Sequence, residues 1–185
     1  VRSSNAQFLS QDVLEKLSFK FLDQQGSEGW SIFSLDYKID TPPLNALLSP
    51  DAMRSYRRIF NFLCKVKRID LALNQLWLAH AKESGKSREE RRIFHSCNLL
   101  RHAMAHFVNN IYSYIMVAIE SAWENFMLDL DKAGNFDEVI AMHDQFLGSL
   151  LEITFQTGGS KPIHASLFCV FELIARFKIN QDRLL

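Results

Sequence analysis

The fold is decided by residues 29–68, which read GWSIFSLDYKIDTPPLNALLSPDAMRSYRRIFNFLCKVKR. From Phe33 to Asp40 apolar and polar side chains alternate, a pattern typical of a half-buried β-strand. Pro42 and Pro43 follow closely. Because proline has no amide hydrogen to donate to a sheet, we expect the strand to end before them.

A long helix is predicted directly after this strand. Ser49 can accept a hydrogen bond from the first free amides, Pro50 suits the first helical position, and Asp51 lies near the positive end of the helix dipole. A stripe with steps of three and four then predicts a helix that runs to about Lys82 with one face on a core. The members of the stripe are Met53, Tyr56, Ile59, Phe60, Leu63, Val66, Ile69, Leu73, Leu76, Trp77 and His80.

A second alternating run covers Leu17 to Phe21. Together with the first strand it predicts a small antiparallel β-hairpin near the N-terminus. A two-stranded sheet is only marginally stable alone, so we expect it to lie on the helices. Before the hairpin, Ser10 can cap a short helix that continues through Leu14.

Three further helices are expected downstream. Residues 87–133 contain no Gly or Pro, which predicts a very long helix, and we allow for a kink within it. Its apolar residues form a wide stripe, as in a helix that packs on more than one neighbour. The stripe includes Ile93, Phe94, Cys97, Leu100, Met104, Phe107, Ile111, Tyr114, Ile115, Ala118, Ala122, Trp123 and Phe126. Asn135 and Glu138 form a capping-box-like start of the next helix, which should stop before Gly158, and a last helix should follow Pro162. The predicted fold class is therefore mainly α, a helical bundle with long helices and a small antiparallel β-hairpin, forming a single domain over 1–185.

Composition narrows the function. The 185 residues are 48% hydrophobic and 23% charged, as in a globular domain with a sizeable core. Lys and Arg together number 21, as do Asp and Glu, so no overall charge attracts nucleic acid or an anionic membrane. The longest nearly apolar run, 111–122, is too short to span a bilayer. Cys64, Cys97 and Cys169 are far apart and odd in number, so we expect buried thiols in a soluble, intracellular protein.

The sequence offers little catalytic chemistry. The best metal-ligand group is His95, Cys97, His102 and His106, but it has no carboxylate at helical spacing and no cysteine pair. We therefore expect no metal and no cofactor, and we interpret these histidines as packing or partner-facing residues. Residues 158–161 lack the spacing of a phosphate-binding loop, and they predict a loop between helices. No nucleophile motif is present, so we expect no enzyme.

Basic side chains crowd the first long helix, and two interpretations stay open for them. They form either a solvated face or a docking patch for an acidic protein surface. The set is Arg54, Arg57, Arg58, Lys65, Lys67 and Arg68. The three tryptophans, Trp30, Trp77 and Trp123, are expected in the core, as aromatic residues at helical spacing usually are.

A family resemblance rests on specific positions in this stretch and beyond it. They are Trp30, Leu35, Asp36, Tyr37, Pro42, Tyr56, Phe60, Asn61, Phe62, Leu63, Lys67 and Arg68, followed by Met104, His106, Phe107, Tyr114, Glu120, Trp123, His143, Phe146 and Leu147. In this series the chain resembles the γ-tubulin complex protein family over most of its length. The resemblance implies the later portion of the C-terminal γ-tubulin-binding module of a larger protein.

The resemblance also implies a function. A member of this family would be a non-catalytic component that binds γ-tubulin and helps template microtubule nucleation at microtubule-organising centres, the centrosome or spindle pole, in the cytoplasm. Its implied partners are γ-tubulin and other γ-tubulin complex proteins, with neither nucleic acid nor membrane. The implied contact candidates are Tyr37, Lys38, Asp40, Arg57, Arg58, Lys67 and Arg68. The alternative is a helical scaffold domain that binds another protein partner.

Overall fold

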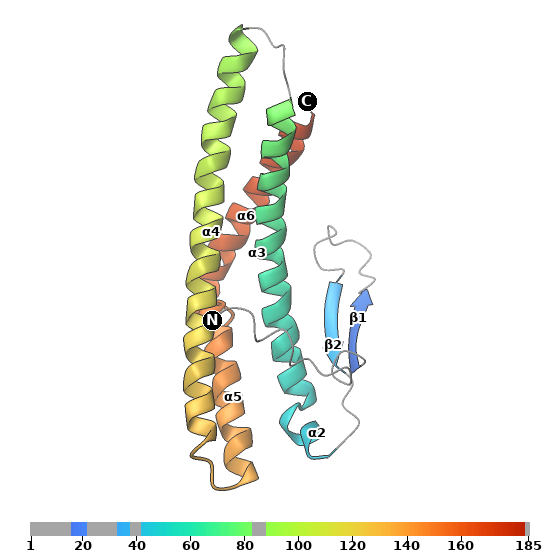
Figure 1. Cartoon of the computed structure of the whole chain (residues 1–185), viewed down its shortest axis with the longest axis vertical. Coiled ribbons are helices and arrows are strands. Elements are labelled where there is room, and N and C mark those ends of the chain that lie inside the picture. The colour runs from blue at the N-terminus through green and yellow to red at the C-terminus, as the bar shows by residue number, and fades with distance from the viewer. Residues whose placement is uncertain (1–15, 22–32, 38–41, 83–87, 184–185) are drawn as a thin grey trace. The chain divides into compact units, whose positions relative to one another are not determined.

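A computed structural model of the chain describes residues 16–21, 33–37, 42–82 and 88–183. This part of the protein is mainly helical, which confirms the mainly α character that the sequence predicts (Figure 1). The long helices are α3 (Pro50–Lys82), α4 (Arg88–Leu130), α5 (Phe136–Ile153) and α6 (Lys161–Asp182). A short α2 (Leu44–Leu47) precedes them, and a 3₁₀ turn, η2 (Gly158–Ser160), precedes α6.

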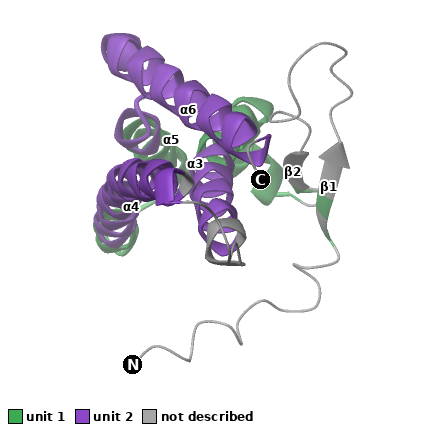
Figure 2. Ribbon diagram, turned by 90° about the horizontal axis from the view of Figure 1, so that it is seen from above, with its two compact units in different colours: residues 1–62, 125–149 green, residues 63–124, 150–185 purple. Residues whose placement is uncertain are grey.

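The chain divides into two compact units, and each contains segments distant in sequence (Figure 2). Unit 1 comprises residues 1–62 and 125–149, and unit 2 comprises residues 63–124 and 150–185. Helices α3, α4 and α5 each contribute one part to unit 1 and another part to unit 2. The expectation of a single domain stays a prediction.

Two short strands lie before the helices. β1 (Leu17–Phe21) and β2 (Phe33–Tyr37) pair antiparallel, with Leu17 opposite Tyr37 and Phe21 opposite Phe33 (Figure 1). The segment that joins them, the expected helix at 10–14 and the expected strand end at Asp40 lie outside the described residues. That the sheet rests on the helices stays a prediction.

Helix α3 begins as its sequence predicts. The hydroxyl of Ser49 accepts a hydrogen bond from the amide of Ala52 at 3.2 Å, and Pro50 is the first helical residue. Asp51 forms an exposed ion pair with Arg54 one turn later. The predicted start and end of this helix are therefore confirmed.

The core-facing stripe of α3 is largely confirmed. Its buried residues are Ala52, Ile59, Phe62, Val66, Ile69, Ala72, Leu73 and Leu76. Phe60 is only half-buried, whereas Phe62 is buried. The core position predicted for Trp77 is wrong, since this side chain is 53% exposed. Successive helical residues point about 100° apart, so burial of Leu76 turns Trp77 outward.

Helix α4 is one helix over Arg88–Leu130, most of the predicted 87–133, but its buried stripe is narrower than predicted. Val108, Ile115 and Phe126 are buried. Trp123 is 50% exposed, so its predicted core position is wrong. Four other members of the predicted stripe are also exposed, namely Ile93, Leu100, Phe107 and Tyr114. A stripe this wide would need neighbours on more than one side, and the described residues cover only part of it.

The capping box before α5 is confirmed. The amide of Glu138 donates to Oδ1 of Asn135 at 2.9 Å, and the carboxylate of Glu138 accepts from the amide of Gly134 at 2.8 Å. Helix α6 begins at Lys161, with Pro162 in its first turn, and buries Leu167, Phe171 and Ile174. None of the helices in the described ranges is long and apolar enough to cross a membrane.

Candidate protein-binding surface

The predicted contact residues near the strands are only partly described. Tyr37 is the last residue of β2, and its side chain is half-buried. Lys38 and Asp40 lie outside the described residues. From this end of the sheet, Tyr37 is therefore the one candidate whose position in the structure can be given.

Two arginine candidates belong to the part of α3 in unit 1. Arg57 is half-buried, and its Nε donates a hydrogen bond to the carbonyl of Met53 at 3.2 Å. This bond holds the side chain back along its own helix. Arg58 is exposed. The structure thus presents Arg58 to solvent more fully than Arg57.

The other two basic candidates belong to the part of α3 in unit 2. Nζ of Lys67 lies 3.6 Å from the ring centroid of Tyr112 on α4, a cation–π contact, and 3.9 Å from a carboxylate oxygen of Asp70. Arg68 is exposed, and its charge acts on the thiol of Cys64. Burial raises the pKa of that thiol, and the charge of Arg68 partly opposes the rise.

The seven predicted residues do not form one described group. Tyr37, Arg57 and Arg58 belong to unit 1, whereas Lys67 and Arg68 belong to unit 2. Lys67 also stabilises its own unit by contacting Tyr112. The candidates share a segment of sequence, and the structure does not show that they share one surface.

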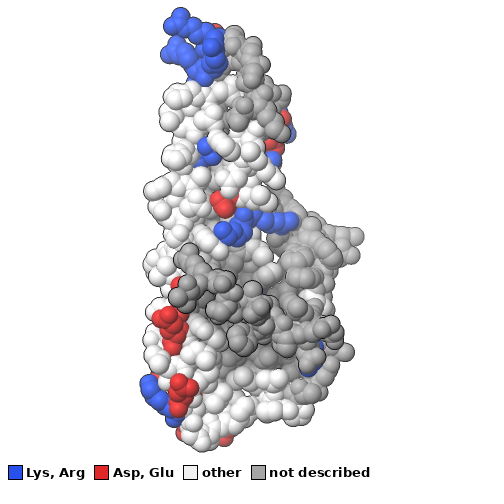
Figure 3. All heavy atoms as spheres, viewed as in Figure 1, with Lys and Arg blue, Asp and Glu red and all other residues white. Residues whose placement is uncertain are grey.

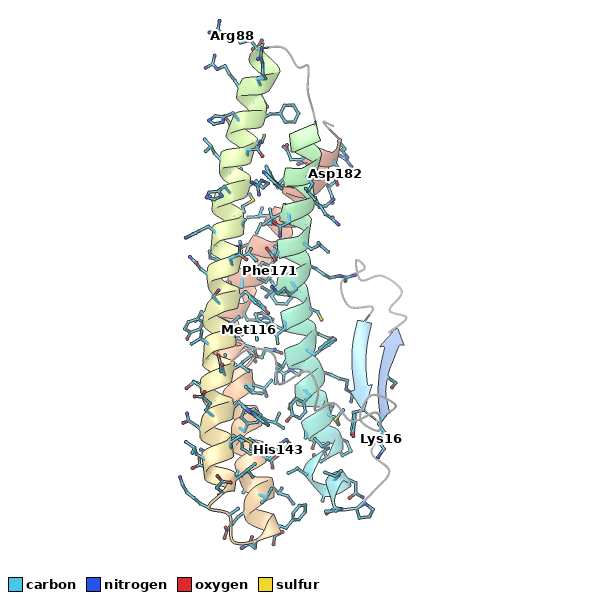
Figure 4. The ribbon with its side chains drawn as sticks, in the orientation of Figure 1. Lys16, Arg88, Met116, His143, Phe171 and Asp182 are labelled. Atoms are coloured by element: carbon cyan, nitrogen blue, oxygen red, sulfur yellow. The ribbon has the colours of Figure 1, made fainter. Side chains whose placement is uncertain are left out.

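A polar cluster inside unit 1 links three helices. The hydroxyl of Tyr56 on α3 and Nε2 of His143 on α5 share a hydrogen bond of 2.9 Å. The His143 ring lies 6.1 Å from the ring of Phe126 on α4, which stacks on Phe146 at 4.7 Å. His143 is 3% exposed and appears by name in Figure 4. The sequence pattern places Tyr56 on the predicted core stripe of its helix, but it does not predict a bond between Tyr56 and His143.

Burial governs the titration of this pair. It lowers the pKa of the His143 imidazole, with a smaller opposing effect from the Asp144 carboxylate, and it raises the pKa of the Tyr56 hydroxyl. Both groups are therefore neutral near pH 7. Nδ1 of His143 has no hydrogen-bond partner within the described part of the chain. The cluster is a packed, neutral structural element of the core of unit 1.

The other histidines and cysteines whose side chains the structure describes are dispersed. His95, His102 and His106 are exposed, and the Sγ of Cys97 accepts a hydrogen bond from Nε2 of Gln181 at 3.4 Å. Among residues 16–21, 33–37, 42–82 and 88–183, no three metal-ligating side chains are close enough to hold an ion.

The expectation that all three thiols are buried is wrong, because Cys64 and Cys97 are only half-buried and Cys169 is exposed. On α6, Cys169 lies midway between the buried residues Leu167 and Phe171. Two helical residues span about 200°, so Cys169 points to the opposite side of the helix.

Sequence reasoning missed a basic surface at the start of α4. A shallow hollow there is lined by Arg88, Arg91, Arg92, His95 and Ser96. Lys and Arg side chains gather at this end of α4 in Figure 3, where Figure 4 labels Arg88. The available signal was the Arg-x-x-Arg-Arg run at the predicted helix start.

Comparison with known proteins decides the family. A model described as "Gamma tubulin complex component C-terminal" matches residues 1–185. The chain belongs to this family. It is 33% identical to gamma-tubulin complex component 3 of Arabidopsis thaliana over 197 residues, covering 100% of the chain and 23% of the relative. It is 31% identical to the human protein of the same name over 187 residues, which cover 98% of the chain and 20% of that relative.

A third relative carries a different name. Spindle pole body component 98 of Dictyostelium discoideum is 32% identical over 190 residues, covering 100% of the chain and 23% of the relative. The chain thus spans less than a quarter of the length of these family members. Gly29-Trp30, the Ser-Leu-Asp-Tyr run and the Phe-Asn-Phe-Leu run predict a likeness to the third component within the family, and the relatives with that name confirm it.

Proposed function

We propose that this chain forms the later portion of the C-terminal module of a γ-tubulin complex protein and contributes to binding γ-tubulin. The observation that carries the proposal is the family match over the whole of residues 1–185. The relatives named as gamma-tubulin complex and spindle pole body components support a role in microtubule nucleation at a microtubule-organising centre. Other γ-tubulin complex proteins are the further partners that this role requires.

The proposed role is that of a non-catalytic scaffold. The core of unit 1 joins three helices through the Tyr56–His143 bond and the Phe126–Phe146 stack, an arrangement that fixes helix positions. A rigid helical module of this kind can hold γ-tubulin in a fixed orientation, so that successive subunits template a microtubule end. The chain would position γ-tubulin, and nucleotide hydrolysis would be carried out by tubulin.

The contact surface within this proposal includes the exposed basic face of α3. Arg58 is exposed and the half-buried Arg57 precedes it in unit 1, so the two charges can meet acidic groups of a protein partner. Tyr37 and Arg68 stay candidates. Lys67 is a weaker one, because its ammonium group already contacts the Tyr112 ring.

The experiment measures binding of purified γ-tubulin to the chain and to an N-terminally extended version, with folding checked by circular dichroism. Arg57→Glu/Arg58→Glu should weaken binding at least about tenfold while the melting temperature changes little. The matched control is Arg176→Glu/Arg183→Glu, which reverses two exposed charges of unit 2 and should leave affinity unchanged. Equal affinities for the two variants would remove this face from the interface.

A second candidate function is a helical scaffold for another protein. The exposed apolar side chains of α4 favour it, because large apolar side chains in solvent commonly mark protein contacts. Absence of γ-tubulin binding by both the chain and its extended version, when both are folded, would support this candidate against the first.

A further inference from the structure

Large apolar side chains recur every seven residues on the exposed face of α4. They are Ile93, Leu100, Phe107 and Tyr114. Each of these side chains is 38–61% exposed, so this row lies beside the buried row of α4 and not within it. We call these four residues, with the residues three positions after each, the outer seam of α4. A seven-residue apolar repeat on a helix is the pattern with which one helix packs along another.

The second row of the outer seam is made of smaller side chains. Ser96, Ala103, Asn110 and Val117 each follow a large residue by three positions, and all four are exposed. Small residues next to large ones allow the axis of a second helix to approach closely. The seam from Ile93 to Val117 is roughly 36 Å long at about 1.5 Å per residue.

We propose that the outer seam of α4 pairs with the same seam of a second copy of this chain, with the two helices antiparallel. In the register that we propose, each large residue meets a second-row residue of the other copy. The pairs are Ile93 with Val117, Leu100 with Asn110, Phe107 with Ala103, and Tyr114 with Ser96. Each contact occurs twice, because a two-fold axis relates the copies.

The charges beside the seam select this partner and this direction. Arg88 and Arg92 lie at its beginning, and Glu120 and Glu124 lie at its end, all with exposed side chains. In the register above, Arg92 of one copy lies beside Glu120 of the other, and Arg88 lies beside Glu124. A parallel pair would instead place like charges together at both ends, which is unfavourable.

Two acidic residues, Glu89 and Glu90, also lie at the basic end, and of these only Glu89 falls on the seven-residue positions of the seam. Glu89 lies on the seam one turn before Ile93, and in this register it faces the hydroxyl of Ser121. Residues 88–124 all belong to unit 2, so the seam does not depend on how the two units are placed. The apolar layers and the charges therefore specify one arrangement together.

Sedimentation equilibrium of the purified chain, without γ-tubulin, tests the proposal. We expect a monomer–dimer equilibrium at concentrations of about 1–200 µM. Phe107→Asp should raise the dissociation constant at least about tenfold, and Val117→Asp should do the same. Circular dichroism checks that each variant keeps its helices, and because Val117 is 66% exposed its replacement leaves the core intact.

Charge exchange tests the direction. Arg88→Glu/Arg92→Glu should weaken the dimer about tenfold or more, because four attractive contacts become repulsive. Adding Glu120→Lys and Glu124→Lys to the same chain should restore the wild-type dissociation constant. The matched control, Arg176→Glu/Arg183→Glu, reverses two arginines on and after α6 and should have no effect.

Three results would overturn the proposal. They are a wild-type chain that stays monomeric over the whole range, a dimer that Phe107→Asp and Val117→Asp leave unchanged, and a fourfold charge exchange that fails to restore association. The first would leave the seam to a helix of a different protein. Because the assay contains no γ-tubulin, its outcome is independent of the proposed function.

Discussion

Removing one hydroxyl tests the polar cluster of unit 1. Tyr56→Phe deletes the oxygen that bonds to Nε2 of His143 at 2.9 Å and keeps the ring that lies 5.8 Å from the imidazole. Nδ1 of His143 already finds no partner in the part of the chain that the structure describes, and the residue is 3% exposed. The variant therefore leaves a buried imidazole with neither nitrogen bonded to any residue that the structure describes.

The expected cost follows from this loss. A buried polar group deprived of its hydrogen-bond partner destabilises a protein by about 1–3 kcal/mol, which exceeds the net contribution of an average hydrogen bond. We expect the free energy of unfolding to fall by that amount in urea titrations at pH 7.5. Tyr114→Phe is the matched control, because the Tyr114 side chain is 61% exposed, and its free energy of unfolding should change by less than about 0.5 kcal/mol.

A double-mutant cycle separates the bond from its surroundings. With His143→Phe as the background, no imidazole is left unbonded, so Tyr56→Phe should cost much less than it does in the wild-type chain. Two results would refute the reasoning. One is a loss of unfolding free energy on Tyr56→Phe that is equal in the wild-type and His143→Phe backgrounds. The other is an equal loss of unfolding free energy for Tyr56→Phe and Tyr114→Phe.

Two further predictions concern the same unit. Burial lowers the pKa of His143 below its usual value of 6.5, so near that pH the unfolded chain takes up a proton and the folded chain does not. The free energy of unfolding should therefore fall as the pH drops below about 6.5, by at most about 1.4 kcal/mol per pH unit from this group. His143→Phe should make this dependence on pH weaker in urea titrations between pH 7.5 and 5.5. Phe62→Ala should lower the free energy of unfolding by about 3–5 kcal/mol, since Phe62 is 3% exposed. Phe60→Ala should lower it distinctly less, because Phe60 is only half-buried. If thermal melts gave the reverse order, the buried face of α3 would be wrongly assigned.

The helices could be predicted because their signals are local. Ser49 and Pro50 mark the start of α3, and Asn135 with Glu138 marks the start of α5, through hydrogen bonds between residues three apart. Helix α5 ends at Ile153, before Gly158 as predicted, but no local signal marks the residue at which it ends. Phe155 there has φ of 58°, a conformation in which glycine is usual, and its ring stacks on Tyr114 at 6.5 Å. A contact between residues so far apart in sequence cannot be found from local patterns.

The side chains of the candidate surface were harder to predict, for a related reason. Sequence shows that Lys67 is basic and lies on a helix, but its contact with Tyr112 depends on how α3 and α4 pack within unit 2. Trp77 and Trp123 were wrongly expected in the core, because the pattern shows that a residue is apolar and not which neighbour covers it. Burial is a property of the packed helices together.

Helix α4 carries two apolar rows, one buried and one exposed, and the exposed row needs a functional explanation. Val108 and Ile115, seven residues apart, are buried within the chain, whereas Phe107 and Tyr114, one position before each, repeat at the same interval and face solvent. A helix needs only one apolar row to pack within its own unit. A second row with the same period is costly in water unless another helix covers it, which is why we interpret the outer seam of α4 as an interface and the inner row as the core of unit 2.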